Sequence, residues 1–270
     1  MTQASLSLHP ITATIRESEF DLFAELCQAL QQAELSVCEG DILAVSSKYA
    51  AISEGRVVTL SEVVVGPEAQ LLANRYGIQA QLAQLVWEEA EHVFGGIQLG
   101  FTLSAHHGII APNAGVDRSN IPSGKAVLLP RAPYALAAEL CAALRNWAAC
   151  DVGLVLTDSC LLPGRLGTTG IAVATAGFAP VQDERGRPDL FGNAMTVTQR
   201  GIADSLAAAA QLVMGERDEA TPFALIRGSH IPLCDRSIHP ADVAIDWRDC
   251  IYVQSLTEGL LIATPMTPLK

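Results

Sequence analysis

The chain has 270 residues, of which 50% are hydrophobic, and a mean hydropathy of +0.29. A chain of this length and composition can bury one large core or two of ordinary size, so disorder is not expected. Its 17 basic and 29 acidic residues give a net charge of −12, which argues against nucleic acid or an anionic membrane as the main partner. No apolar run approaches the ~20 residues of a membrane span, and residues 1–10 lack the basic and apolar parts of a secretory signal. We therefore expect a cytoplasmic protein.

Helix and strand signals alternate along the first half of the chain. Apolar residues recur at helical spacing within residues 18–35, and residues 41–45 read as a buried strand. Residues 67–93 predict two helices separated at Gly77. Residues 99–111 predict two short strands. This order indicates a mixed α/β protein.

The second half continues the alternation. A helix is expected around residues 136–147, and a strand over residues 152–156. Residues 197–213 predict an alanine-rich helix capped by Gly215, and residues 222–226 predict a last core strand. Residues 130–133 are a candidate hinge between two halves.

Three acidic residues stand where predicted elements end. Asp117 lies in a polar turn after an apolar run, Asp158 follows the strand at 152–156, and Glu216 follows the helix at 197–213. Open α/β proteins gather ligand-binding groups at such ends, and hard oxygen ligands from separate loops suit Mg²⁺ or Mn²⁺ held together with nucleotide phosphates. The structural alternative stays open, because an aspartate also commonly bonds its own turn or caps a helix.

Several familiar motifs are absent, which disfavours a P-loop, an ordinary dinucleotide fold, a serine hydrolase and a zincin. Residues 164–170 predict either an anion-binding nest or a flexible loop, with no preference between them. The pair His106-His107 is interpreted as a surface turn rather than a catalytic pair. The seven cysteines show no C-x-x-C pair, so we expect reduced and mostly buried thiols.

Several segments together resemble the coenzyme F420-0:L-glutamate ligase family. The match runs in consistent order over residues 11–228, and residues 229–270 form a divergent C-terminal extension. The segments that carry the resemblance are residues 40–48, 54–56, 113–120, 151–159, 189–192, 203–204, 212–216 and 226–228.

The resemblance implies an F420 ligase-like fold of mixed α and β structure in an intertwined homodimer. It also implies a ligase that uses GTP and Mg²⁺ or Mn²⁺, with K⁺ as a further candidate ion, to join L-glutamate in γ-linkage to a deazaflavin through an acyl phosphate. Matched by position, the expected metal ligands are Asp117, Asp158, Ser159 and Glu216. The expected nucleotide-binding residues are Thr12, Ala13, Thr14, Ile15, Ser47, Lys48 and Asn120. Arg165 is expected to neutralise charge on the transferred phosphoryl group.

The chain departs from the family pattern at two places. Ile52 stands where the family has a lysine, and residues 160–165 lack one arginine, at Leu162, and two aromatic rings. Three alternatives therefore stay open: an amide ligase that acts on another carboxylate acceptor, a homologue that binds a nucleotide or cofactor without chemistry, and a structural partner protein that needs none of the acids.

Overall fold

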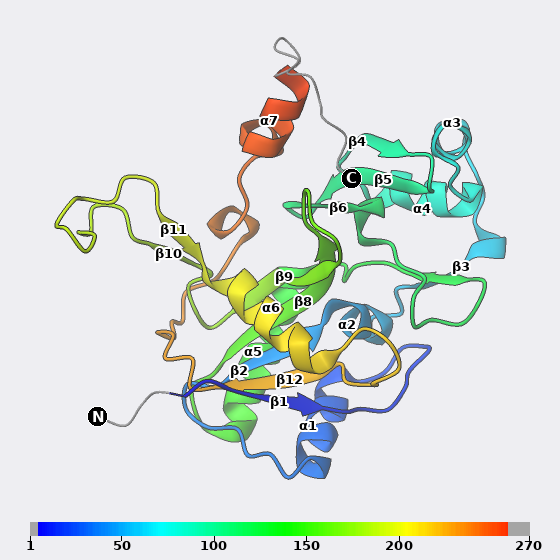
Figure 1. Cartoon of the computed structure of the whole chain (residues 1–270). Helices are drawn as coiled ribbons and strands as arrows, with labels where there is room; N and C mark the ends of the chain where they lie inside the picture. The colour runs from blue at the N-terminus through cyan, green and yellow to red at the C-terminus, as the bar shows by residue number, and fades with distance from the viewer. Residues whose placement is uncertain (1–4, 259–270) are drawn as a thin grey trace.

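The computed structural model describes residues 5–258 and is built around a five-stranded sheet (Figure 1). The strand order is β1-β12-β2-β8-β9, and only the β2–β8 pair is parallel. The strands are β1 (Ser7–Ile11), β2 (Ile42–Ser46), β8 (Gly153–Leu161), β9 (Thr168–Ala176) and β12 (Phe223–Arg227). The last strand of the sheet in sequence thus lies between the first two.

Helices cover both faces of this sheet. Helices α1 (Leu22–Gln32) and α5 (Pro133–Ala148) contribute to the core cluster on one face, and α6 (Ile202–Met214) packs on the other, in front of the sheet in Figure 1. Successive strand side chains point to opposite faces, so Leu43 belongs to the first cluster and Ile42 to the second. Burial on both faces explains why β2 reads as a continuous apolar run.

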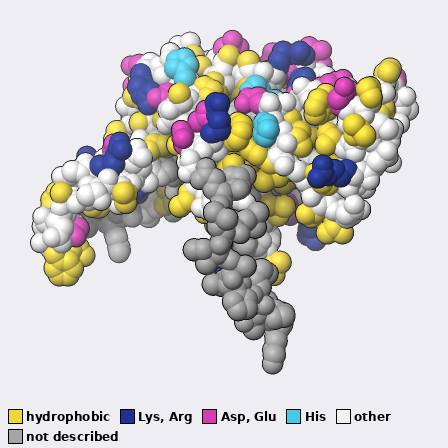
Figure 2. All heavy atoms as spheres, turned by 90° about the horizontal axis from the view of Figure 1, so that it is seen from above, with side chains coloured by type: hydrophobic (Ala, Val, Ile, Leu, Met, Phe, Trp, Pro, Cys, Tyr) yellow, Lys and Arg dark blue, Asp and Glu magenta, His cyan; other side chains and the backbone are white. Residues whose placement is uncertain are grey.

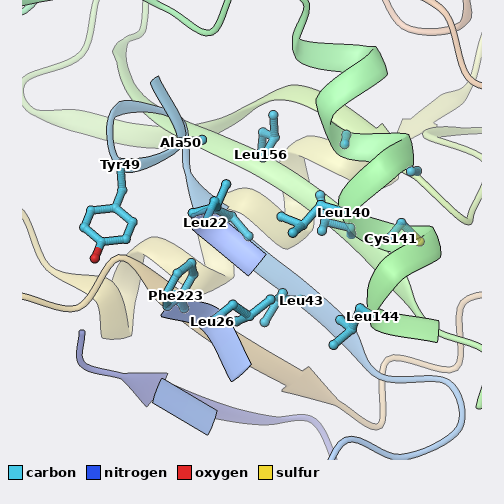
Figure 3. Packing of buried hydrophobic residues seen from close by; sticks show 14 of the residues in the cluster. Leu22, Leu26, Leu43, Tyr49, Ala50, Leu140, Cys141, Leu144, Leu156 and Phe223 are labelled. Carbon is cyan, nitrogen blue, oxygen red and sulfur yellow. The ribbon is translucent and has the colours of Figure 1, made fainter. Parts of the chain in front are cut away.

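Figure 3 shows the first of these clusters, in which Leu26, Leu43, Leu144 and Phe223 pack together from two helices and two strands. Tyr49 lies at its edge with its hydroxyl oxygen directed away from the labelled leucines. The edge of the cluster at Tyr49 therefore borders polar groups, among them the Thr14 carbonyl oxygen that accepts the Tyr49 hydroxyl.

A second region has a core of its own, formed mainly by helices α3 (Pro67–Tyr76) and α4 (Ala80–Glu89). A three-stranded antiparallel sheet lies beside them, at the upper right of Figure 1. Its strands are β4 (His92–Ile97), β5 (Phe101–His106) and β6 (Ile109–Pro112). The remaining elements here are β3 (Val57–Thr59), η1 (Leu60–Glu62), η2 (Asn113–Gly115) and β7 (Lys125–Val127). Helix α2 (Ser47–Ser53) directly follows β2 and packs with Tyr49 and Ala50 in the first core cluster.

A two-stranded arm projects from the body, formed by β10 (Val181–Asp183), β11 (Gln199–Gly201) and the loop between them. Its tip exposes Leu190 and Phe191, which are 99% and 89% exposed, and hydrophobic side chains mark this end in Figure 2. After β12 the described chain contains η3 (Pro240–Asp242), η4 (Trp247–Asp249) and α7 (Ile251–Glu258). The part of the predicted extension after residue 258 lies outside the described residues.

Most of the predicted elements are present, and four differ in extent. The predicted strand over residues 152–156 continues to Leu161, so Asp158 lies within β8 and not after it. The predicted helix over residues 197–213 begins only at Ile202, because residues 199–201 pair with β10. The predicted helical region up to residue 93 ends at Glu89, and β4, which the sequence analysis missed, starts at His92. Residues 164–170 are neither a nest nor a loop throughout, since their last three residues begin β9.

The described residues contain no helix that is long and apolar enough to cross a membrane. All seven cysteines are free thiols, as expected, but only Cys141 and Cys160 are buried, whereas Cys38 is exposed. The predicted hinge at residues 130–133 leads directly into α5, whose first residue is Pro133.

We expect Gly170→Ala to destabilise the protein, because β9 lies very close to α6 at this position. A Cβ atom at Gly170 would lie 2.3 Å from the backbone oxygen of Ala207 in α6, so the helix must move away from the sheet. The expected loss is about 1–3 kcal/mol in the free energy of unfolding, measured by urea denaturation.

Gly201→Ala is the matched control, since its Cβ atom would meet nothing closer than 3.6 Å at the start of the same helix. Equal stability of the Gly170→Ala variant and the control would show that the contact between β9 and α6 is not tight.

Candidate active site

A cavity of about 640 Å³ lies where the parallel pairing of β2 with β8 ends. Ser46 and Thr157 are the last pair, so the residues that follow them in the chain start side by side. Strand β2 continues into α2 through Ser47 and Lys48, and β8 continues through Asp158. Other walls are formed by residues 13–17, 119–122 and 214–222. The volume is that of an ordinary small-molecule site.

Most of the residues expected to bind nucleotide or metal line this cavity; three of them do not, and neither does Arg165, the expected catalytic residue. The lining residues are Ala13, Thr14, Ile15, Lys48, Asn120, Asp158, Ser159 and Glu216. Thr12 precedes the lining segment, and Ser47 is buried at the start of α2. Asp117 lies beside the cavity and Arg165 lies apart from it.

Lys48 links the two aspartates. Its ammonium forms an ion pair with Oδ2 of Asp117 and donates a hydrogen bond to the Ser119 hydroxyl at 2.7 Å. Burial raises the pKa of Asp117, but Lys48 and the Ser119 N–H group lower it more, so this carboxylate is ionised. The same ammonium acts on Asp158 through space.

The ionised form of Asp158 is less well stabilised than that of Asp117. Burial raises its pKa to about 6, Asp117 adds to the effect, and Lys48 and the Ser159 N–H group offset only part of it. The Ser47 hydroxyl near it has no hydrogen-bond partner of good geometry among the described residues. A half-buried carboxylate in this setting is stabilised by an added cation.

Glu216 approaches the cavity from the end of α6. Gly215 ends the helix with a φ of 72°, and the Glu216 carboxylate then accepts hydrogen bonds from Gln211 and, at 2.8 Å, from Thr168 at the start of β9. The Asn120 side chain donates to the Glu216 carbonyl oxygen at 3.3 Å. Glu216 therefore joins three segments at the cavity wall.

The oxygens of Asp117, Asp158 and Glu216 line or adjoin one cavity but do not form a compact ligand group. Among the described residues, their carboxylates are not all within 4.8 Å of one another. Their assignment as metal ligands, together with Ser159, therefore remains a prediction.

An ion pair between the buried Glu25 and the partly exposed Arg16 holds the segment that was expected to bind nucleotide. Glu25 is 4% exposed, accepts from the Thr14 N–H group at 2.9 Å and pairs with Arg16. Tyr49 donates its hydroxyl hydrogen to the Thr14 carbonyl oxygen at 2.7 Å, and burial raises its pKa to about 12. A backbone bond from Ala13 to the carbonyl of residue 220, 3.0 Å long, ties the segment to the opposite wall.

The sequence analysis missed three contributors to the cavity: Arg16, Tyr49 and residues 217–222. Arg16 directly follows the predicted nucleotide segment, and residues 217–219 are a charged run after the helix-ending glycine, so both carried a usable signal. Tyr49 carried none, because a tyrosine in a short helix is more often core.

The positions at which the chain departs from the family pattern lie in different places. Ile52 is 4% exposed, lines the cavity and packs in a small apolar cluster with Val127. Leu162 and Arg165 lie in the exposed turn between β8 and β9, and neither lines the cavity. The catalytic role expected for Arg165 remains a prediction.

The comparisons with known proteins agree on one family. The family model described as F420-0:Gamma-glutamyl ligase matches residues 10–228, which include every wall of the cavity. The coenzyme F420:L-glutamate ligase of Methanopyrus kandleri is 35% identical over 227 residues, covering 83% of this chain and 87% of its own length. The protein of the same name from Methanothermobacter thermautotrophicus is 34% identical over 211 residues, covering 77% and 82%. That of Halobacterium salinarum is 38% identical over 207 residues, covering 74% and 79%.

We expect Glu25→Gln to lower stability in a pH-dependent way. Burial alone would raise the pKa of Glu25, but Arg16 and the Thr14 N–H group hold it below its ordinary value. A lowered folded-state pKa adds stability above the unfolded value of about 4.5, and this stability is lost as pH falls through the folded value. Urea denaturation at pH 7 should show a loss of about 1–2 kcal/mol that shrinks toward zero below pH ~4.

Glu139→Gln, at an exposed position of α5, is the control and should unfold like the wild type at every pH. A constant loss for Glu25→Gln at all pH values would contradict the ion-pair explanation.

Proposed function

We propose that this chain, which belongs to the F420-0:gamma-glutamyl ligase family, joins L-glutamate in γ-linkage to coenzyme F420-0 in a reaction that consumes GTP and needs a divalent cation. The observation that carries the proposal is the placement of Lys48 and Asp158 on the wall of one cavity, just beyond the last pair of two parallel strands inside the matched region. The family and the relatives' names support a ligase, and the geometry supports the nucleotide and the cation.

The donor set suits Mg²⁺ or Mn²⁺. Asp158, Ser159 and Glu216 offer oxygen ligands on the cavity wall, and Asp117 adjoins them through Lys48. The raised pKa of Asp158 shows that its ionised form lacks a sufficient counter-charge. These residues would hold the cation, which supplies positive charge to the phosphates of GTP in a protein whose net charge is −12. K⁺ stays an untested candidate for a further ion.

Basic side chains of the chain complete the phosphate environment. Arg16, Lys48 and Arg217 all line the cavity from different segments. In the proposed reaction the γ-phosphoryl group of GTP passes to the carboxylate of F420-0, leaving GDP. The glutamate amine then attacks the acyl phosphate and releases inorganic phosphate, so one amide bond forms for each GTP consumed. The role of Lys48 and Arg16 is to orient the phosphates and offset their charge.

A homodimer is part of the proposal. The small sheet of the second region exposes a group of apolar side chains, which supports association: Ile97, Leu99, Phe101 and Leu103 are between 43% and 78% exposed.

A second candidate is an amide ligase for a less anionic carboxylate acceptor. Ile52 favours it, because an apolar side chain stands on the cavity wall where the family has a lysine.

The first test is product formation by the purified chain with GTP, L-glutamate, F420-0 and Mn²⁺, followed by mass spectrometry and phosphate release. We expect one added glutamate per phosphate released, and a dimer mass by light scattering in the same buffer. Asp158→Asn should weaken Mn²⁺ binding and lower turnover by about 10²-fold or more, because an anionic oxygen is lost from a hard-cation site. Its melting temperature should not fall.

Glu139→Gln serves as the control for a distant acid. Nucleotide binding without any amide product would favour the homologue that lacks chemistry, and full activity of Asp158→Asn would remove that residue from the site.

A further experiment addresses the departure at Ile52. We expect Ile52→Lys to tighten GTP binding by about 10-fold, because a charge-assisted hydrogen bond to a phosphate is worth about 1.5–3 kcal/mol and part of that is lost in burying the lysine stem. Leu162→Arg is the matched control, since Leu162 is outside the cavity and the added charge should change GTP affinity little. Calorimetric titration measures both. If neither substitution improves a robust wild-type activity, Arg16 and Arg217 already compensate and the ordinary family function holds.

A further inference from the structure

A second group of ligand-type side chains lies on the small sheet, at the turn between β5 and β6. Ligand atoms of Glu91, His106 and His107 all lie within 4.8 Å of one another, and within residues 5–258 no other His, Cys, Asp or Glu trio does so. Figure 2 looks down on the part of the molecule where Figure 1 places this sheet, and histidine side chains there lie among acidic and hydrophobic ones. The surface turn expected for the two histidines is wrong for His106, which is 6% exposed.

His106 is a buried imidazole whose ring nitrogens make no hydrogen bond of good geometry among the described residues. The nearest carboxylate oxygen, Oε2 of Glu89, is 3.8 Å from Nε2, and that carboxylate is already paired with Arg56 at 2.5 Å. A buried imidazole whose ring nitrogens make no good hydrogen bond has a ligand atom free for a metal ion, and histidine is the commonest metal ligand.

The backbone holds the three side chains in place before any ion binds. The Glu91 N–H group donates to the Ala105 carbonyl oxygen at 2.8 Å, and the Glu91 carboxylate accepts from the His107 N–H group at 2.9 Å. His106 pairs with Ile109, and the two residues between them, His107 and Gly108, both have positive φ, at 49° and 79°. This is the tight hairpin turn that fixes strand register, so both imidazoles stand at a defined corner.

We propose that Glu91, His106 and His107 form a binding site for one Zn²⁺ ion. Two imidazoles and one carboxylate are a zinc ligand set, and a tetrahedral ion with bonds of about 2.0–2.1 Å needs ligands about 3.4 Å apart. Glu91 is exposed and His107 half-buried, so these two side chains can close the remaining distance and leave the fourth position to water. The ion satisfies His106 and joins the β5–β6 turn to the start of β4.

This site is independent of the proposed ligase chemistry. It uses nitrogen ligands, which favour Zn²⁺ over Mg²⁺, whereas the cavity offers oxygen ligands only. None of its three residues lines the cavity. A failure here therefore leaves the ligase proposal intact, and the reverse also holds.

The experiment titrates the metal-free full chain with Zn²⁺ alone, against a chromophoric chelator, without nucleotide or acceptor. The test variants are Glu91→Gln, which keeps the acceptor for the His107 N–H group, and His107→Asn, which tolerates the positive φ. His230→Asn is the matched control, because His230 is exposed and has a φ of 53°. Asp158→Asn reports any Zn²⁺ that binds in the cavity instead.

We expect one Zn²⁺ per wild-type chain and a rise in melting temperature on binding. Each test variant should bind at least about 10-fold more weakly, since even partners outside the ligand shell cost 10–100-fold when lost. The His230→Asn and Asp158→Asn variants should bind like the wild type. Co²⁺ as a spectroscopic substitute should show no thiolate charge-transfer band, which separates this site from the free cysteines. Three results would overturn the proposal: no saturable Zn²⁺ binding by the wild type, Zn²⁺ affinity of both test variants equal to that of the wild type, or a thiolate band in the Co²⁺ spectrum.

Discussion

The candidate active site depends on one pairing, the parallel contact between β2 and β8. Parallel strands in register run toward the same edge of a sheet, and the pairing of β2 with β8 stops at Ser46 and Thr157. Beyond this point β2 gives way to α2, and β8 continues through Asp158 before it turns back into β9. Lys48 and Asp158 therefore meet although 110 positions separate them in the chain. Every other pair in the central sheet is antiparallel and could not have placed two strand ends together. The cavity is the space that this single parallel pair leaves between the segments that follow it.

Charge balance at that edge explains much of the local structure. Two aspartates share one ammonium group, and the carboxylate that receives the smaller share, Asp158, is the one whose pKa is raised. A second, buried pair of opposite charges, Glu25 and Arg16, fixes the backbone on the facing wall. The Glu25–Arg16 pair thus fixes the position of the backbone, whereas the charge of Asp158 is only partly offset by Lys48. Groups with perturbed pKa values cluster at functional sites, which favours Asp158 as a binding group.

Sequence patterns predicted the elements whose signals are local. The two helices separated at Gly77 and the two strands around His106-His107 follow directly from periodicity and turn residues. The three acids were found because each follows an apolar run, although Asp158 proves to lie within β8 rather than after it. Strand β9 was missed because threonine, glycine and alanine give it a weak apolar pattern, although α6 packs closely on it. The burial of Glu25 and of His106 was beyond reach for another reason. Each lies among groups brought together from distant segments, and no local pattern marks an ionisable residue as buried.

The position of β12 between β1 and β2 has a consequence for the order in which the chain can fold. Strand β1 pairs in the sheet only with β12, so Ser7 cannot take its place until Arg227 is present. Closing such a long loop costs chain entropy before the strands gain any contacts. The helices α3 and α4 adjoin in sequence and can pack early, whereas the bond that ties Ala13 to the opposite wall forms only once residue 220 is in place. The cavity wall includes residues up to 222, so during synthesis the cavity forms only after more than four-fifths of the 270 residues have been added. Ligand binding therefore requires a complete central sheet.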